Sequence, residues 1–99
     1  MESPPVINDL IVIEYGCFPE PLLPTGYVPP PNGKAPLRPV QNVAICRTAG
    51  VDGFYTVFCT RDWEYVTAEF NETVEYAKRT PLREFGQDVD EWKTLEMTR

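Results

Sequence analysis

The sequence predicts an α+β fold, in which a three- to four-stranded antiparallel sheet carries one helix on one face. Segments 42–48, 54–60 and 64–70 have strand length, are apolar or alternate between apolar and polar residues, and are separated by turn-forming residues. A helical pattern begins directly afterwards, at Asn71. Because consecutive strands joined by short turns pair antiparallel, we expect residues 42–86 to form a strand-strand-strand-helix core.

Length and composition indicate one domain. The chain has 99 residues, which close a single hydrophobic core, and its 42 % hydrophobic and 24 % charged residues are ordinary for a globular domain. We divide the domain, 1–99, into a proline-rich wrapping segment at 1–41, the core at 42–86 and an acidic tail at 87–99. Trp92 in this tail is expected to pack back over one end of the core.

The wrapping segment contains one candidate strand. Residues 10–15 are a short β-branched run that could add a fourth strand to the sheet. Eight prolines between Phe18 and Pro39 remove backbone donors, so this part is expected to be extended, partly polyproline II, and to cover a sheet face. The alternative is that Pro29 to Pro31 form a ligand for an aromatic-lined groove.

Loop length decides which side chains of the first hairpin share a face. A two-residue loop at Asp52-Gly53 would place Cys46 opposite Cys59, and a disulfide between them is the minority alternative. We favour a loop of four or five residues. The inner face, toward the helix, is then expected to collect the following side chains: Val43, Ile45, Tyr55, Val57, Cys59, Val66, Ala68 and Phe70.

Several aromatic residues are left for the opposite face. Strand alternation places Phe54, Phe58 and Tyr65 there, with Trp63 in the tight turn at 60–63. A half-exposed sheet in a monomer does not normally carry so much aromatic surface. We therefore expect the wrapping segment or a partner to cover this face.

The helix has recognisable start and stop signals. Asn71 suits the N-cap and Gly86 the position after the last helical residue. Pro81 cannot donate to the carbonyl of Ala77, so we expect a kink, or a restart with Thr80 as a new cap.

Residue types argue against catalysis. The chain has no histidine, and its three cysteines, at 17, 46 and 59, form no metal-binding pair. Buried structural thiols are expected, with Cys17 the one to probe with a thiol reagent. Glu64, Glu69, Glu72 and Glu75 could in principle act as paired carboxylates, but a solvated acidic face is the simpler interpretation. We predict no enzyme activity, no cofactor and no metal.

Several residues at fixed spacings in the core segment form a recognisable sequence pattern. Gly53-Phe54-Tyr55-x-x-Phe58-Cys59 is followed by Trp63, Val66-Thr67, Thr73-x-x-x-Ala77, Glu84-Phe85 and Trp92, and this pattern over 43–92 resembles a group of small uncharacterised bacterial proteins. The resemblance implies a hairpin, a third strand and a helix, with no assigned reaction. The chain departs from the group at Ala68 and Asn71, where an acidic residue and a histidine are expected.

Charge and aromatic residues together suggest a function in binding. The net charge of −6 would repel nucleic-acid phosphates, and the short apolar runs fit neither a membrane helix nor a signal peptide, so we expect a cytoplasmic, soluble protein. We predict a small non-catalytic domain that binds a basic protein, as immunity proteins and inhibitors do. There are two alternatives. The first is a self-associating accessory domain, and the second is a small-ligand binder or an enzyme that uses carboxylates or Cys17. The candidate partner-binding residues are Phe54, Phe58, Trp63, Tyr65, Glu69 and Glu72.

Overall fold

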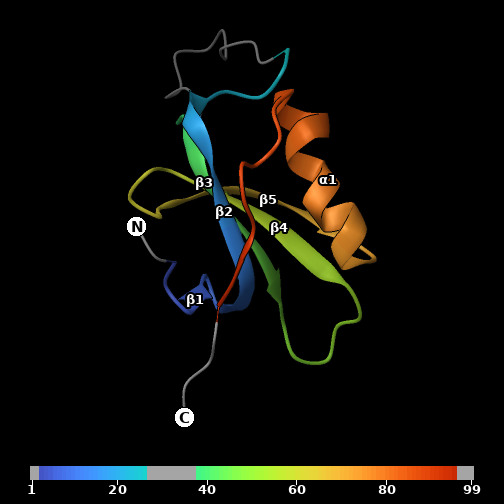
Figure 1. Ribbon diagram of the computed structural model, residues 1–99. Coiled ribbons are helices and arrows are strands. Elements are labelled where there is room, and N and C mark those ends of the chain that lie inside the picture. Colours follow the sequence, from blue (N-terminus) through green and yellow to red (C-terminus); the bar gives the residue numbers. More distant parts are fainter. Residues whose placement is uncertain (1–2, 27–37, 96–99) are drawn as a thin grey trace, which may run out of the picture.

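The computed structural model describes residues 3–26 and 38–95, which form an antiparallel sheet and one helix. The elements in chain order are β1 (Val6–Ile7), β2 (Leu10–Leu22), β3 (Val40–Arg47), β4 (Phe54–Cys59), β5 (Tyr65–Asn71), α1 (Val74–Phe85) and β6 (Lys93–Thr94). The strands lie in the order β1-β2-β3-β4-β5, and β6 pairs with β2 (Figure 1). The α+β class is therefore as predicted, with a larger sheet.

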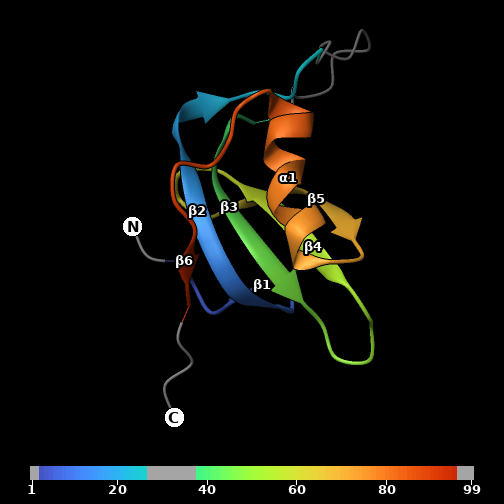
Figure 2. The ribbon, with the colours of Figure 1, turned by 45° about the vertical axis from the view of Figure 1, so that its right-hand side comes forward.

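The sheet is curled and has a hydrophobic core on each face. Helix α1 lies against one face, which we call the helix face, over β3, β4 and β5 (Figures 1 and 2). The buried residues of its core are Phe18, Val40, Val43, Phe58, Phe85 and Val89, with Trp92 packed against them as expected. The opposite face, which we call the far face, buries Ile7, Val12, Ala44, Cys46, Val57 and Cys59.

Strand β2 is much longer than the predicted strand at 10–15. It continues through Pro19 and Pro21, which were expected to exclude sheet structure. Both prolines lie where regular pairing with β3 is interrupted, between Cys17 and Leu22, so neither removes a donor that the ladder needs. The predicted proline-rich covering of a sheet face lies partly in residues 27–37, which are outside the described residues, as is its alternative as a ligand at Pro29 to Pro31.

The register of the first hairpin differs from the prediction by one residue. Val43 pairs with Phe58 and Ile45 with Thr56, while Ala44 pairs with Val57. The loop between β3 and β4 therefore spans residues 48–53, longer than the four or five residues expected. Because neighbouring strand residues point to opposite faces, this shift places Val43 and Ile45 on the face away from Val57, and the predicted inner face is wrong in this respect.

The second hairpin keeps part of the predicted face. Tyr55 and Val57 share a face with Phe70 and Ala68, as expected, but these residues lie on the far face and not beneath the helix. An irregularity in the pairing next to Phe58 sends Val66 to the helix face.

Helix α1 begins later than predicted and is continuous. Its N-cap is Thr73, whose hydroxyl accepts from the backbone N–H of Tyr76, so the assignment of Asn71 as N-cap is wrong. Gly86 ends the helix in the left-handed conformation, with φ 71°, as expected. Pro81 lies inside the helix without the predicted restart at Thr80. Within the described part of the chain, no helix is long and apolar enough to cross a membrane.

Candidate functional site

The predicted partner-binding residues do not form one surface. Phe54 and Phe58 lie on the helix face, and Phe58 is only 1 % exposed because its ring packs 4.8 Å from that of Phe85, centroid to centroid. Trp63 and Tyr65 lie on the side of the far face. The expectation that Phe54, Phe58 and Tyr65 share a face away from the helix is therefore wrong, and Phe58 is a core residue.

Trp63 is held in a strained turn. Its φ of 66° is left-handed, which a tryptophan rarely adopts, and its backbone N–H donates to the carbonyl of Thr60 at 3.0 Å. The Thr60 hydroxyl also accepts from the N–H of Glu64 at 3.2 Å. The indole ring contacts Tyr15 edge-on at 6.0 Å and packs against the far-face core, so this turn fixes the beginning of β5.

Strand β5 forms one margin of the sheet and exposes aromatic side chains. It pairs with β4 only, and no strand of the described residues pairs with its other edge (Figure 2). Phe70 is 47 % exposed and Tyr65 is 38 % exposed, both on the far face. The Phe70 ring contacts Tyr55 edge-on at 5.3 Å, and a side chain at Gly53 would collide with it. Phe70 is therefore an exposed aromatic side chain in a fixed position.

Acidic residues precede and follow β5 in the sequence. Asp62, Glu64, Glu72 and Glu75 are all exposed, and no Lys or Arg occurs between residues 62 and 75. Arg38 approaches from outside this segment: it pairs with Glu64 at 2.7 Å and donates to the carbonyl of Tyr65 at 3.1 Å. We call the exposed residues of β5 and of the segments that flank it, including the first turn of α1, the β5 surface; they are Asp62, Glu64, Tyr65, Phe70, Glu72 and Glu75.

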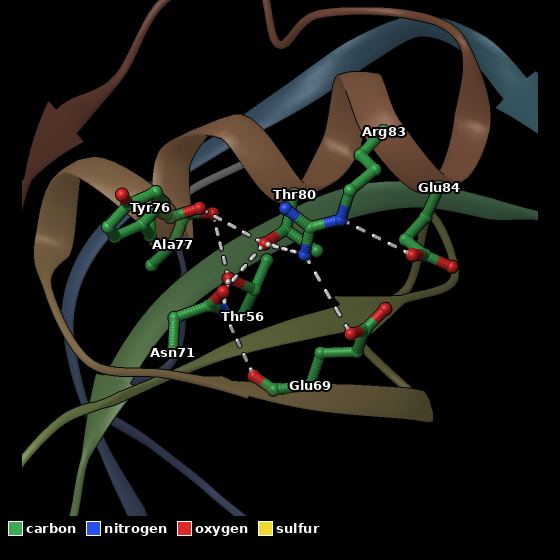
Figure 3. Close-up of polar contacts among 8 residues, drawn as sticks. All are labelled: Thr56, Glu69, Asn71, Tyr76, Ala77, Thr80, Arg83 and Glu84. Atoms are coloured by element: carbon green, nitrogen blue, oxygen red, sulfur yellow. Dashed lines mark hydrogen bonds and ion pairs between the residues drawn. The ribbon is translucent and has the colours of Figure 1, made fainter.

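A buried polar network attaches α1 to β4 and β5. The Asn71 side-chain N–H donates to the Thr56 hydroxyl at 3.1 Å, and that hydroxyl donates to the carbonyl of Ala77 at 2.8 Å (Figure 3). The Thr80 hydroxyl donates to the Asn71 side-chain oxygen at 3.2 Å. Thr56 and Thr80 are fully buried, and each has partners, so this network is explained by the attachment of the helix.

A pair of carboxyl groups bridges α1 and β5 beside the network. The side chain of Arg83 lies between the two carboxyl groups, 3.9 Å from that of Glu69 and 3.7 Å from that of Glu84 (Figure 3). Burial, and then the neighbouring carboxyl group of Glu84, raise the pKa of Glu69, and Arg83 partly opposes this rise.

The hollow beside these carboxyl groups is small. Its volume is about 190 Å³, and Pro24, Phe58, Thr67 and Phe85 complete its walls. Known ligand pockets are larger, about 300 Å³ or more. Within the described residues no group of three or more His, Cys, Asp or Glu side chains could hold a metal ion. The hollow therefore brings two carboxyl groups together but leaves little room for a substrate.

Cys17 is exposed between two open hollows on the other side of the sheet. The hollows measure about 270 and 460 Å³ and share Cys17 and Asn42. The Asn42 side-chain N–H groups already donate to the carbonyls of Thr60 and Arg61, at 3.1 and 2.9 Å. This amide therefore supports the turn after β4 and is not free to hold a ligand.

The other two thiols are buried and free. Burial raises the pKa of Cys46 to about 12, with a further contribution from nearby Cys59, and burial likewise raises the pKa of Cys59 to about 12. Both thiols are protonated at neutral pH and are structural, as the sequence indicated.

The sequence does not predict the roles of two residues of the site, Phe70 and Arg38. The sequence predicts Phe70 on the inner face of the sheet, yet it is the most exposed of the five phenylalanines that the structure describes. Its place near the end of the last strand of the core was the available signal, because a side chain at an edge has neighbours on one side only. Nothing in the local sequence relates Arg38 to Glu64, since 26 positions separate them.

Comparison with protein-family models, with curated proteins and with solved structures finds no match for this chain.

Proposed function

We propose that this protein is a small, acidic, non-catalytic binding protein that holds a basic partner protein on the β5 surface. The observation that supports this most directly is Phe70, a rigidly positioned aromatic ring that is 47 % exposed at an open margin of the sheet. Exposed aromatic side chains of this kind act as anchors in protein interfaces, because they bury a large area at little cost in conformational entropy.

Charge determines the kind of partner. The β5 surface combines two aromatic residues with four carboxylates, and the whole chain has a net charge of −6. Such a surface speeds the approach of a basic protein and repels an acidic one. This chemistry supports an immunity-type or inhibitor role, in which the protein neutralises a basic partner in the cytoplasm. The three free thiols are compatible with a reducing compartment.

The alternatives receive less support. A second copy of the chain would bring the same carboxylates together, so self-association through this surface is opposed by like charge. For an enzyme, the paired carboxyl groups of Glu69 and Glu84 are the best candidate. They border a hollow of only about 190 Å³, and Arg83 and the core account for their arrangement.

A capture experiment with matched variants tests the proposal. The wild-type protein, Phe70→Ser and Leu82→Ser are immobilised and exposed to a lysate of the source organism, and the retained proteins are identified by mass spectrometry. Leu82 is the control because it is also an exposed large apolar residue, 51 % exposed, but lies on the helix. We expect wild type and Leu82→Ser to retain the same basic protein, which Phe70→Ser loses.

Salt provides the second measurement. Raising the ionic strength to about 1 M shortens the Debye length to about 3 Å and should release this protein. Retention that is unchanged in Phe70→Ser, or the absence of any basic protein that distinguishes the two variants, would contradict the proposed function.

A further inference from the structure

The free edge of β5 is suited to pairing with another strand. The strand has seven residues, Tyr65–Asn71, and among the residues that the structure describes it hydrogen-bonds only to β4, along one side. In an antiparallel pair, alternate residues direct their N–H and C=O groups away from the partner, so an edge strand presents a row of unpaired donors and acceptors. On this side the structure shows a side-chain donor only at the start of the strand, from Arg38 to the carbonyl of Tyr65.

The strand lacks most of the usual protection against such pairing. Native edge strands are commonly blunted by proline, lysine or a very short length. Residues 65–71 include no proline, glycine or lysine, and most of them favour extended structure. The one pairing irregularity lies at the beginning, next to Phe58, so the run from Thr67 to Asn71 is regular and directly available.

The two faces of this run differ in chemistry, and that defines the occupant. Thr67, Glu69 and Asn71 point to the helix face, whereas Ala68 and Phe70 point to the far face. An added strand would have its side chains beside these, because cross-strand neighbours lie about 5 Å apart. Apolar residues on the far face of the added strand complement Ala68 and Phe70. Glu69 already pairs with Arg83 at 3.9 Å, so the preference for a basic strand comes from the exposed carboxylates that precede and follow the run, Asp62, Glu64, Glu72 and Glu75. A second β5 would bring these carboxylates of two copies together and is disfavoured.

The geometry points to strand addition: a basic, extended segment of the partner protein, in which Lys or Arg alternates with apolar residues, pairs with the free edge of β5. This inference rests on the proposed function and specifies its binding mode. The backbone of β5 supplies the hydrogen bonds, Phe70 supplies the apolar contact, and the surrounding carboxylates select a basic sequence.

A synthetic peptide of eight alternating Lys and Val residues is the probe. Its binding to the ¹⁵N-labelled protein is followed by amide chemical shifts, and a Glu-Val peptide of the same length is the charge control. Two further Lys-Val peptides are N-methylated, one at every Lys and the other at every Val. In a paired strand only one of these sets of N–H groups faces β5, so only one peptide loses its hydrogen bonds to the protein. Since the changes are made in the peptide, the fold of the protein is not at risk.

The expected result is a set of shifts confined to residues 65–71 and their neighbours on β4, with no binding of the Glu-Val peptide. One N-methylated peptide should bind more weakly by at least about tenfold, which corresponds to the loss of one or more hydrogen bonds. The other should stay within about twofold of the parent peptide.

Three outcomes would overturn the inference: equal binding of both N-methylated peptides, shifts away from β5, or no binding of the Lys-Val peptide at millimolar concentration. If a basic protein is nevertheless captured in a Phe70-dependent manner, the proposed function stands and only the binding mode is wrong. If capture also fails, both are wrong.

Discussion

The hydroxyl group of Thr56 donates a 2.8 Å hydrogen bond to the carbonyl oxygen of Ala77. In a regular helix this carbonyl would accept from the N–H four residues later, but that residue is Pro81, which has none. A buried carbonyl without a donor is costly, and a side chain from the sheet removes this cost. The polar contact between sheet and helix explains why α1 continues through a proline that was expected to interrupt it.

Replacing Thr56 should therefore destabilise the protein through the helix. We expect Thr56→Val to lower the free energy of unfolding by about 1–3 kcal/mol, because it leaves the Ala77 carbonyl and the Asn71 amide without their partner. Urea unfolding measures this, with Thr67→Val on β5 as a control that should change stability by less than about 0.5 kcal/mol. In a Pro81→Ala background, where residue 81 can donate to Ala77, Thr56→Val should cost less. An equal cost in both backgrounds would contradict the explanation.

The indole ring of Trp63 stabilises the fold by packing, whereas the left-handed backbone conformation of the same residue destabilises it. Both Trp63→Ala and Trp63→Gly should be destabilising by several kcal/mol, because each removes the indole ring from Tyr15 and the far-face core. Glycine adopts φ near 66° without strain, so Trp63→Gly should be the more stable variant by about 1 kcal/mol. Thermal or urea unfolding of the two variants decides this, and the reverse order would show that the turn is not strained.

Glu69 should make stability depend on pH. Its raised pKa means that the folded protein holds this proton more tightly than the unfolded chain does, so stability is lost as the pH rises above the ordinary value of 4.5 and through the raised pKa. Glu69→Gln is uncharged throughout. The melting temperature of Glu69→Gln minus that of the wild type should therefore be more positive at pH 7 than at pH 4.

A matched control separates this effect from a general change in charge. Glu20→Gln, on an exposed part of β2, removes the same charge without an ion pair in the described structure. A difference for Glu69→Gln that does not vary with pH, or that matches Glu20→Gln, would show that the pKa of Glu69 is not raised in the folded protein.

The cysteines provide a measure of folding. Cys17 is exposed, whereas Cys46 and Cys59 are buried and have their pKa raised to about 12 by burial. A chromogenic disulfide reagent at pH 8 should modify one thiol per native chain and three after denaturation, and Cys17→Ser should show none in the native state. Rapid modification of a second thiol in the native protein would indicate that the far-face core opens.

The elements of the core were predictable because their signals are local. Alternating segments gave three strands close to their observed bounds, and Gly86 marked the end of the helix. Strands β1 and β6 have two residues each, too few for any periodicity to appear. The extension of β2 through Pro19 and Pro21 depends on a gap in pairing with β3, which the sequence of β2 alone does not encode.

The candidate site was less predictable because it depends on register. One residue of loop length decides whether Phe58 faces the helix or the far side, and the turn residues between 48 and 53 permit either. The exposure of Phe70 and the contact of Arg38 with Glu64 are set by strand order and by a separation of 26 positions. The acidic character of the segment 62–75 could be read directly from the sequence, because the charge of a segment does not depend on how its strand pairs.

The return of β6 to β2 has a consequence for how the chain folds during synthesis. Each strand from β2 to β5 pairs with the one before it, so these pairs can form while the chain is leaving the ribosome. Thr94, however, pairs with Glu14, and the approach of this late segment needs the bare backbone of Gly16, where any side chain would collide with Val89. On this side of β2, residues Glu14 and Tyr15 therefore stay unpaired until residue 94 has emerged, although β1 can already pair with Leu10 and Ile11.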